Sequence, residues 1–136
     1  GALLAIHTAS ICFSDWKEWP VILGGAWEWG VSWHPKPEKI NVIPTGHELA
    51  VNNKFSVIDE LYTQLNVRDE TSVLLEGSSD SSKELQPVMW LNEYKSGRIV
   101  YDSLGHTAES IMHPEHTLWI ETAIDWATNR SRGMLT

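Results

Sequence analysis

The stretch Ala2-Leu3-Leu4-Ala5-Ile6-His7-Thr8-Ala9 decides the fold of this chain. Its apolar residues run without alternation, which is typical of a strand buried on both faces of an α/β sheet. The run ends in polar residues that begin with His7. Ligands of α/β sheets bind beyond the carboxyl ends of the strands, so this turn is the first place to expect a functional site.

A second polar turn of the same kind lies in the last third of the chain. The segments 87–91 and 98–102 predict two strands joined by a tight turn, and Gly105-His106-Thr107 follows the second strand. We therefore expect His7 and His106 to meet at the carboxyl edge of one sheet.

The remaining segments predict further strands and helices around this sheet. They are strands at 39–43, 55–58 and 72–75, a helix at 16–23 with Asp15 as its N-cap, an exposed serine-rich loop at 77–84, and a helix opened by Pro114. Strands with intervening helices predict an α/β fold, and the length allows one domain over residues 1–136.

Composition excludes several classes of protein. The formal net charge of −8 would repel phosphate backbones, so we expect no nucleic-acid partner. No apolar run reaches the roughly 18 residues of a membrane span, so we expect no membrane partner. Cys12 is the single cysteine, which argues against a disulfide-built secreted domain, and we expect it to be buried as a small hydrophobic residue. The first residues lack the basic start of a signal peptide, so we expect a cytoplasmic location unless a secretion signal lies upstream of Gly1.

Tryptophan is concentrated near the start of the chain, with five of the eight tryptophans between Trp16 and Trp33. Aromatic and polar residues alternate from Trp27 to Trp33, which predicts an extended segment with the aromatic side chains on one face. Because aromatic faces stack on the C–H surface of pyranose sugars, Trp27 and Trp29 are candidate substrate-binding residues. The alternative is packing in the core or between subunits.

Several segments, taken in order, resemble the trehalose-utilisation (ThuA-like) family. They are the opening strand with its histidine and small residues (2–9), Leu23-Gly24-Gly25 followed by His34-Pro35, Ile58-Asp59-Glu60-Leu61-Tyr62, the hairpin of 87–101 with Leu104-Gly105-His106-Thr107, and Asp125-Trp126-Ala127. The sequence departs from the family pattern at His47-Glu48, where the family usually has His-Pro, and at His113-Pro114, where it often has Asp-Pro.

The resemblance implies a flavodoxin-like α/β fold, related to class I glutamine amidotransferases, with helices flanking the sheet. It also implies that residues 1–136 correspond to the C-terminal two-thirds of the family domain, so that the sheet is N-terminally truncated. An uncovered strand edge favours pairing with another chain. We therefore expect a homodimer that completes the sheet.

The resemblance also places the candidate catalytic residues. His7 stands where an amidotransferase carries its nucleophilic cysteine, so glutamine hydrolysis is not expected. His106 resembles the triad histidine and is expected to act as acid or base, the alternative being a turn histidine bound only by the backbone. Glu60 is the candidate carboxylate, with helix capping or a surface ion pair as the alternative. In an extended segment Asp59 would point to the opposite face.

Two further sets of residues complete the candidate site. Tyr62 and Thr107, which belong to the resembling segments, join the two tryptophans as candidate substrate-binding residues. The candidate ligands of a divalent metal such as zinc are His7, His34, His47 and His106. No short spacing links these histidines, so only the fold can bring them together. We expect the local pair His113 and His116 to be solvated.

Two functions of different classes follow from these residues. The first is an enzyme of carbohydrate metabolism that acts on a keto-disaccharide or glucoside through His106, Glu60 and His7, by acid–base or metal-assisted chemistry. It would be a hydrolase, lyase or isomerase without a cysteine nucleophile. The alternative is a non-catalytic remnant that serves as a sugar-binding or oligomerisation module.

Overall fold

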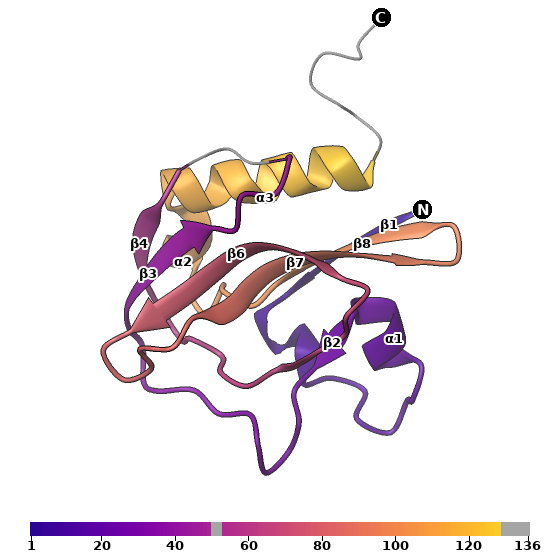
Figure 1. Ribbon diagram of the computed structural model, residues 1–136, viewed down its shortest axis with the longest axis horizontal. Helices are drawn as coiled ribbons and strands as arrows, with labels where there is room; N and C mark the ends of the chain where they lie inside the picture. The colour runs from indigo at the N-terminus through magenta and orange to yellow at the C-terminus, as the bar shows by residue number, and fades with distance from the viewer. Residues whose placement is uncertain (50–52, 129–136) are drawn as a thin grey trace, which may run out of the picture.

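The computed structural model describes residues 1–49 and 53–128, which form a six-stranded mixed sheet with helices on both faces (Figure 1). The sheet order is β1 (Ala2–Ile6), β8 (Gly97–Asp102), β7 (Gln86–Tyr94), β6 (Ser72–Ser79), β3 (Glu38–Pro44) and β4 (Phe55–Asp59). The strands β2 (Gly25–Ala26) and β5 (Asn66–Val67) form a separate small sheet. The helices are the 3-10 helix η1 (His7–Ser10), α1 (Trp19–Leu23), α2 (Ala108–Met112) and α3 (Pro114–Ala127). Within the described ranges, no helix is long and apolar enough to cross a membrane.

The six-stranded sheet separates two hydrophobic cores. Helix α3 covers one face, where its Trp119 packs in the same cluster as Val100 of β8. Helix α1 covers the other face, where its Leu23 packs in the same cluster as Tyr101 of β8. Neighbouring residues of β8 therefore serve opposite cores, and this explains why the burial of β7 and β8 does not alternate. The outer strand β4 does alternate buried and exposed residues.

The strands β1 and β8 form the one parallel pair of the six-stranded sheet, and its other pairings are antiparallel. The register places Ile6 opposite Asp102, so the two strands end at the same level. His7 follows β1 directly and Ser103 follows β8 directly. The two predicted polar turns therefore lie together at the carboxyl ends of these strands.

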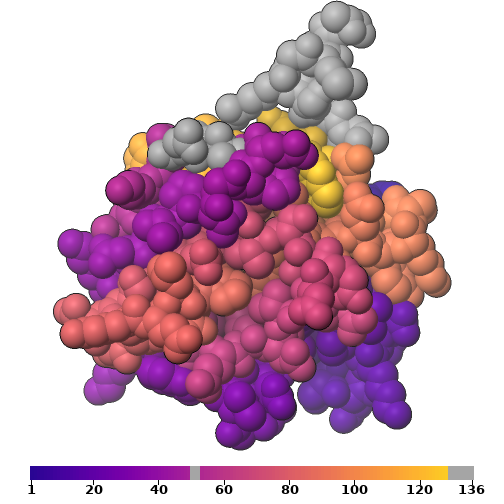
Figure 2. Space-filling view, viewed as in Figure 1, coloured from indigo at the N-terminus to yellow at the C-terminus, as the bar shows by residue number. Residues whose placement is uncertain are grey.

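The main elements expected from the sequence are confirmed. The strands β1, β3, β4 and β6, the hairpin of β7 and β8, and the helix opened by Pro114 lie where they were expected. The α/β fold class is confirmed as well. Space-filling shows that the indigo N-terminal segment borders the orange β7–β8 turn (Figure 2), where the Tyr94 hydroxyl donates a 2.8 Å hydrogen bond to Glu18.

The prediction of an extended segment from Trp27 to Trp33 is wrong. The chain turns at residues 29–31, because the amides of Val31 and Ser32 both donate to the carbonyl of Glu28. Gly30 permits this reversal with a φ of 85°, in the left-handed region that favours glycine. The aromatic side chains therefore do not share one face of a strand.

Three smaller predictions also differ from the structure. Residues 77–79 belong to β6, because Gly77 pairs with Gln86 across the sheet. Helix α1 has Glu18 as its N-cap, because the helix begins at Trp19, beyond the reach of Asp15. Cys12 is exposed, because it lies in the turn after η1, where its thiol donates to the carbonyl of Thr8.

Candidate active site

The strands β1 and β4 are the two edges of the sheet, yet the residues that follow them lie side by side. His7 Nε2, after β1, is 3.3 Å from Glu60 Oε2, after β4. The sheet therefore curls, so that the ends of its edge strands approach each other. This approach places the Glu60 carboxylate at the centre of the candidate site.

Two further histidines reach the same carboxylate from separate loops. His106, in the loop after β8, has its Nδ1 3.2 Å from Glu60 Oε1. His34, in the loop before β3, has its Nε2 3.6 Å from Glu60 Oε2. The His7 and His106 rings lie edge to face with their centroids 5.6 Å apart, which confirms that the two polar turns meet.

The cluster has a buried side and a side open to solvent. Only 7% of the His7 side chain and 12% of the Glu60 side chain are exposed, against 35% for His34 and 42% for His106. A small molecule would therefore reach the carboxylate past His34 and His106.

The backbone holds His7 in an unusual conformation. Its φ is 50°, in the left-handed region that residues other than glycine rarely adopt. The Tyr101 hydroxyl donates a 2.7 Å hydrogen bond to the carbonyl of His7, and the His7 ring bonds the carbonyl of Ser103. Such strain persists only where the surroundings enforce it, and it concentrates at functional sites.

Hydrogen bonds to carbonyl groups fix the tautomers of two histidines. His7 Nδ1 lies 2.7 Å from the carbonyl oxygen of Ser103, and His34 Nδ1 lies 2.8 Å from that of Pro35. A carbonyl oxygen only accepts, so each Nδ1 carries a proton. The Nε2 atoms that face Glu60 are therefore the basic nitrogens when these rings are neutral.

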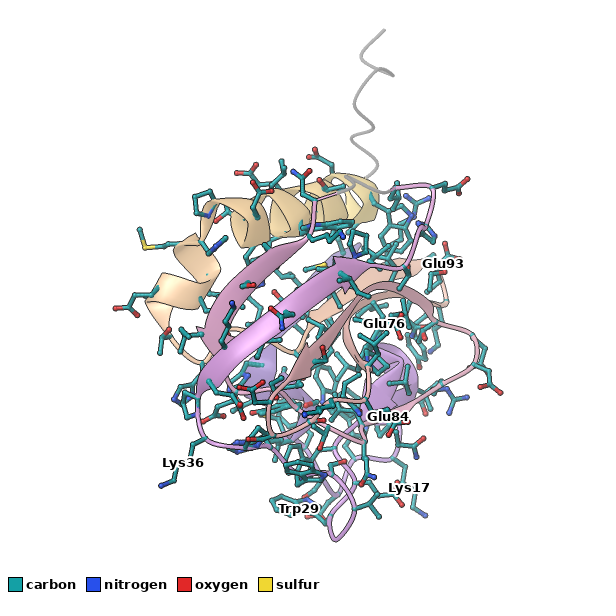
Figure 3. All side chains as sticks on the ribbon, turned by 60° about the vertical axis from the view of Figure 1, so that its left-hand side comes forward. Lys17, Trp29, Lys36, Glu76, Glu84 and Glu93 are labelled. Carbon is teal, nitrogen blue, oxygen red and sulfur yellow. The ribbon has the colours of Figure 1, made fainter. Side chains whose placement is uncertain are left out.

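Aromatic rings form a wall beside the carboxylate. Tyr62 is stacked on His7 with a centroid distance of 4.4 Å, and Trp27 meets Tyr62 edge-on at 5.0 Å. Trp29 packs edge-on against Trp27 and is 70% exposed. Figure 3 shows Trp29 at the end of the molecule away from α3. The wall thus leads from solvent towards Glu60.

The Tyr62 hydroxyl faces the cluster in its neutral form. Burial raises the pKa of Tyr62 well above its usual value, and the negative charge of Glu60 raises it further. The hydroxyl lies 3.2 Å from His7 Nε2. It is therefore available as a hydrogen-bond donor beside the carboxylate.

Asp59 holds the loop that carries His106, a role that the sequence analysis missed. Its carboxylate accepts hydrogen bonds from the amides of Glu60 at 2.7 Å, Gly105 at 2.7 Å and His106 at 3.2 Å, and from the Ser110 hydroxyl. Asp59 is 1% exposed. Glu60 contacts the histidine rings, whereas Asp59 ties β4 to the β8–α2 loop.

The prediction that His116 is solvated is wrong, because His116 is fully buried in an ion pair. Its Nε2 lies 2.6 Å from Asp102 Oδ2, and its Nδ1 lies 2.7 Å from the carbonyl of Ser110. Burial lowers the pKa of His116, but the charge and hydrogen bond of Asp102 outweigh burial and raise it overall. Since both ring nitrogens face acceptors, both carry a proton and His116 is positively charged. Its bond to the carbonyl of Ser110 joins α3 to α2, and the Ser110 hydroxyl in turn bonds Asp59 of the site.

Two predicted site residues lie outside the cluster. His47 follows the end of β3 at Pro44, whereas Glu38, at the other end of β3, pairs with Asp59. Thr107 is the N-cap of α2, where its side chain accepts from the amide of Ser110. Three of the proposed histidines, His7, His34 and His106, thus meet at Glu60, while His47 does not and Thr107 caps the helix after the His106 loop.

Gly105 permits the close approach of this loop to β1. Its φ is 119°, and a Cβ there would lie 2.6 Å from a methyl of Ile6.

We expect Gly105→Ala to lower the free energy of unfolding by about 1–3 kcal/mol, from strain and overlap together. Urea unfolding measures this loss. Gly46→Ala is the matched control, because Gly46 has a φ of 87° but no atom within 4 Å of its Cβ position. Equal losses in the two variants would show that the contact with Ile6 is unimportant.

Comparisons with known proteins agree with this architecture. The family model for trehalose utilisation (ThuA) matches residues 1–127. A ThuA-like protein from Parabacteroides merdae has a similar structure, with a TM-score of 0.82 at 17% identity over 100% of this chain and 63% of that chain. The cytoplasmic protein STM1381 from Salmonella typhimurium gives 0.60 at 16% identity over 96% of this chain and 54% of that chain.

A third similar structure is the cold-adapted β-galactosidase from Rahnella sp. R3, with a TM-score of 0.64 at 14% identity over 100% of this chain and 20% of that chain. The chain thus spans less than two-thirds of the length of each of these proteins. Identities this low show the fold alone. No curated protein matches the chain in sequence.

Proposed function

Because this chain belongs to the trehalose utilisation (ThuA) family, we propose that it acts as an enzyme on a small carbohydrate at the Glu60 cluster. The substrate class is a keto-disaccharide or glucoside of the trehalose type. The reaction is hydrolysis, elimination or isomerisation without a cysteine nucleophile.

One observation carries this proposal: three histidines from separate segments point a ring nitrogen at one largely buried carboxylate. Glu60 supplies the negative charge, and His106 is the acid or base because it is the histidine most open to solvent. His7 lies on the buried side of the cluster, where its Nε2 contacts the carboxylate of Glu60 at 3.3 Å. Proton transfer at sugar hydroxyl and carbonyl groups needs groups of this kind, held within hydrogen-bond reach.

The aromatic wall supports a sugar as the substrate. Trp29 is exposed and adjoins Trp27, which in turn contacts Tyr62 beside the carboxylate. A pyranose ring stacked on the tryptophans would bring its hydroxyl groups to Glu60 and His106. Thr107 contributes by capping α2, which holds the His106 loop in place.

The competing proposal is a non-catalytic module within a larger carbohydrate-processing protein. The similar structure of a β-galactosidase, of which the match covers 20%, favours it. The edge strand β1 also leaves backbone groups that a second copy of the chain would pair. The retained cluster at Glu60 favours the enzyme, because a module for assembly needs no such convergence of histidines.

We expect turnover of at least one keto-disaccharide or keto-glucoside by the purified chain, measured by product chromatography against the unoxidised parent sugars. His106→Ala should lower kcat/KM about 100-fold, at the lower end for a general acid or base, because water can partly replace an exposed group. The control is His47→Ala, which removes a histidine outside the cluster and should leave turnover unchanged. No turnover of any of these sugars by the wild-type chain would favour the non-catalytic module.

A further inference from the structure

We propose that His7, Glu60 and His106 form a binding site for a divalent cation of the zinc type, with His34 flanking it. This inference deepens the proposed function, since it concerns the same cluster, but cation binding can be measured without any substrate. The cation would be one that accepts nitrogen and carboxylate ligands together, such as Zn²⁺, Co²⁺ or Mn²⁺.

The spacing of the ligand atoms fits a bound cation. One ligand atom from each of His7, Glu60 and His106 lies within 4.8 Å of the others. His7 Nε2 is 3.3 Å from Glu60 Oε2, and His106 Nδ1 is 3.2 Å from the other carboxylate oxygen, Oε1. Ligands on a tetrahedral zinc ion, with bonds of about 2.1 Å, lie about 3.4 Å apart. A cation could therefore enter between these atoms with shifts of the side chains alone.

The tautomers give an independent argument for a cation. The Nδ1 proton of His7 is bound by the carbonyl of Ser103, so its Nε2 presents a lone pair to Glu60 when the ring is neutral. The same holds for His34, whose Nδ1 bonds the carbonyl of Pro35. Lone pairs that face a carboxylate oxygen repel it unless a proton or a cation lies between them. A cation between His7 Nε2 and the Glu60 carboxylate would accept an electron pair from each, with the lone pair of His34 Nε2 facing the same carboxylate.

The groups behind the ligands match those of protein metal sites. Histidine ligands usually donate their second ring N–H to a carbonyl or carboxylate, which sets the tautomer and the direction of the ring. The carbonyl of Ser103 does this for His7. Asp59 accepts from the amides of Glu60 and His106 and so holds two ligands in register. The site is thus supported on both sides of the carboxylate.

The cluster is partly open to solvent on one side, where a substrate could approach the cation. His34 and His106 lie on the side open to solvent, and Trp27 and Tyr62 stand beside it. A sugar carbonyl or hydroxyl oxygen could take the remaining coordination position and be polarised there. His47, at the far end of β3, takes no part.

Isothermal titration of the chelator-treated chain with ZnCl₂ tests the proposal, with absorption spectra of the Co²⁺ form as a second measurement. We expect one cation per chain in the wild type and in His47→Ala, the matched control. Changing a group that only hydrogen-bonds to a metal ligand typically weakens metal binding roughly 10–100-fold. His106→Ala removes a ligand itself and should weaken cation binding by more than this, and Glu60→Gln should abolish it. His106 is 42% exposed, so its variant should fold. Circular dichroism checks the folding of both variants.

Wild-type chain that binds no cation, or His106→Ala and Glu60→Gln variants that are folded and bind as wild type, would overturn the proposal. A cluster in which hydrogen bonds, rather than a cation, join the histidines to Glu60 would give this result. The two proposals fail separately. Turnover by a wild-type chain that binds no cation in the titration retains the proposed enzyme and removes the cation site. Cation binding without turnover of any sugar retains the cation site and removes the enzyme.

Discussion

Glu60→Gln is expected to lower kcat/KM for the carbohydrate substrate by at least about 1,000-fold, because it removes the charge on which the cluster converges. Three histidines point at this carboxylate, and only 12% of its side chain is exposed. An amide of nearly the same shape presents no negative charge to a cation, an imidazolium or a developing positive centre. Water cannot replace it, since the carboxylate lies on the buried side of the cluster.

Steady-state kinetics on any sugar that the wild-type chain converts measures this loss. The melting temperature should stay close to that of the wild type, because glutamine keeps the volume of glutamate. Glu84→Gln is the matched control, since Glu84 is exposed and lies in the loop between β6 and β7. A Glu60→Gln variant with turnover within a few-fold of wild type would remove this carboxylate from the chemistry.

Asp102→Asn is expected to cost about 3–5 kcal/mol of unfolding free energy, because it leaves the buried His116 without its counter-charge. The pair is fully buried, with His116 Nε2 2.6 Å from Asp102 Oδ2. Asparagine can still accept from the amide of Leu104, as Asp102 Oδ1 does. The loss therefore reports the ion pair with His116 rather than the turn after β8.

The same pair makes stability depend on pH in a defined direction. The pKa of His116 in the folded chain lies above the model-peptide value of 6.5, so the folded state holds its proton more tightly than the unfolded state. The stabilisation by this pair is complete below about pH 6.5, and it is lost as the pH rises through the raised pKa. This loss should disappear in Asp102→Asn.

Urea unfolding at a series of pH values from 5 to 9 checks both statements. Asp80→Asn serves as the control, because Asp80 is exposed in the turn between β6 and β7. Equal stability of Asp102→Asn and wild type across this range would show that the ion pair contributes nothing to the fold.

The sequence predicts the sheet better than the site. The opening strand, the β7–β8 hairpin and helix α3 follow from apolar runs, turn residues and a proline at a helix start, which are local signals. The Trp27–Trp33 segment also shows a clear period of two, but Gly30 allows a turn and Ser32 holds it with a hydrogen bond to the amide of Glu28. Periodicity alone cannot separate a strand from a turn of this length.

The buried network behind the site left little signal in the sequence. Asp59 and Ser110 are 51 positions apart, and His116 contacts Asp102 across 14 positions. Burial of these polar groups depends on α2 and α3 folding back over the end of β8. A polar residue that follows a strand predicts a site, but its partner on another element is invisible until the elements pack.

The sequence by itself determined the α/β class, the family, and the two polar turns that carry His7 and His106. These features depend on local signals, namely apolar runs that end in polar residues and the order of the motifs along the chain. Only the tertiary structure decided that Glu60 joins them, that His34 belongs to the cluster and that His47 does not. The physical reason is the curl of the sheet: it brings the ends of the edge strands β1 and β4 together while the end of β3 that leads to His47 points away.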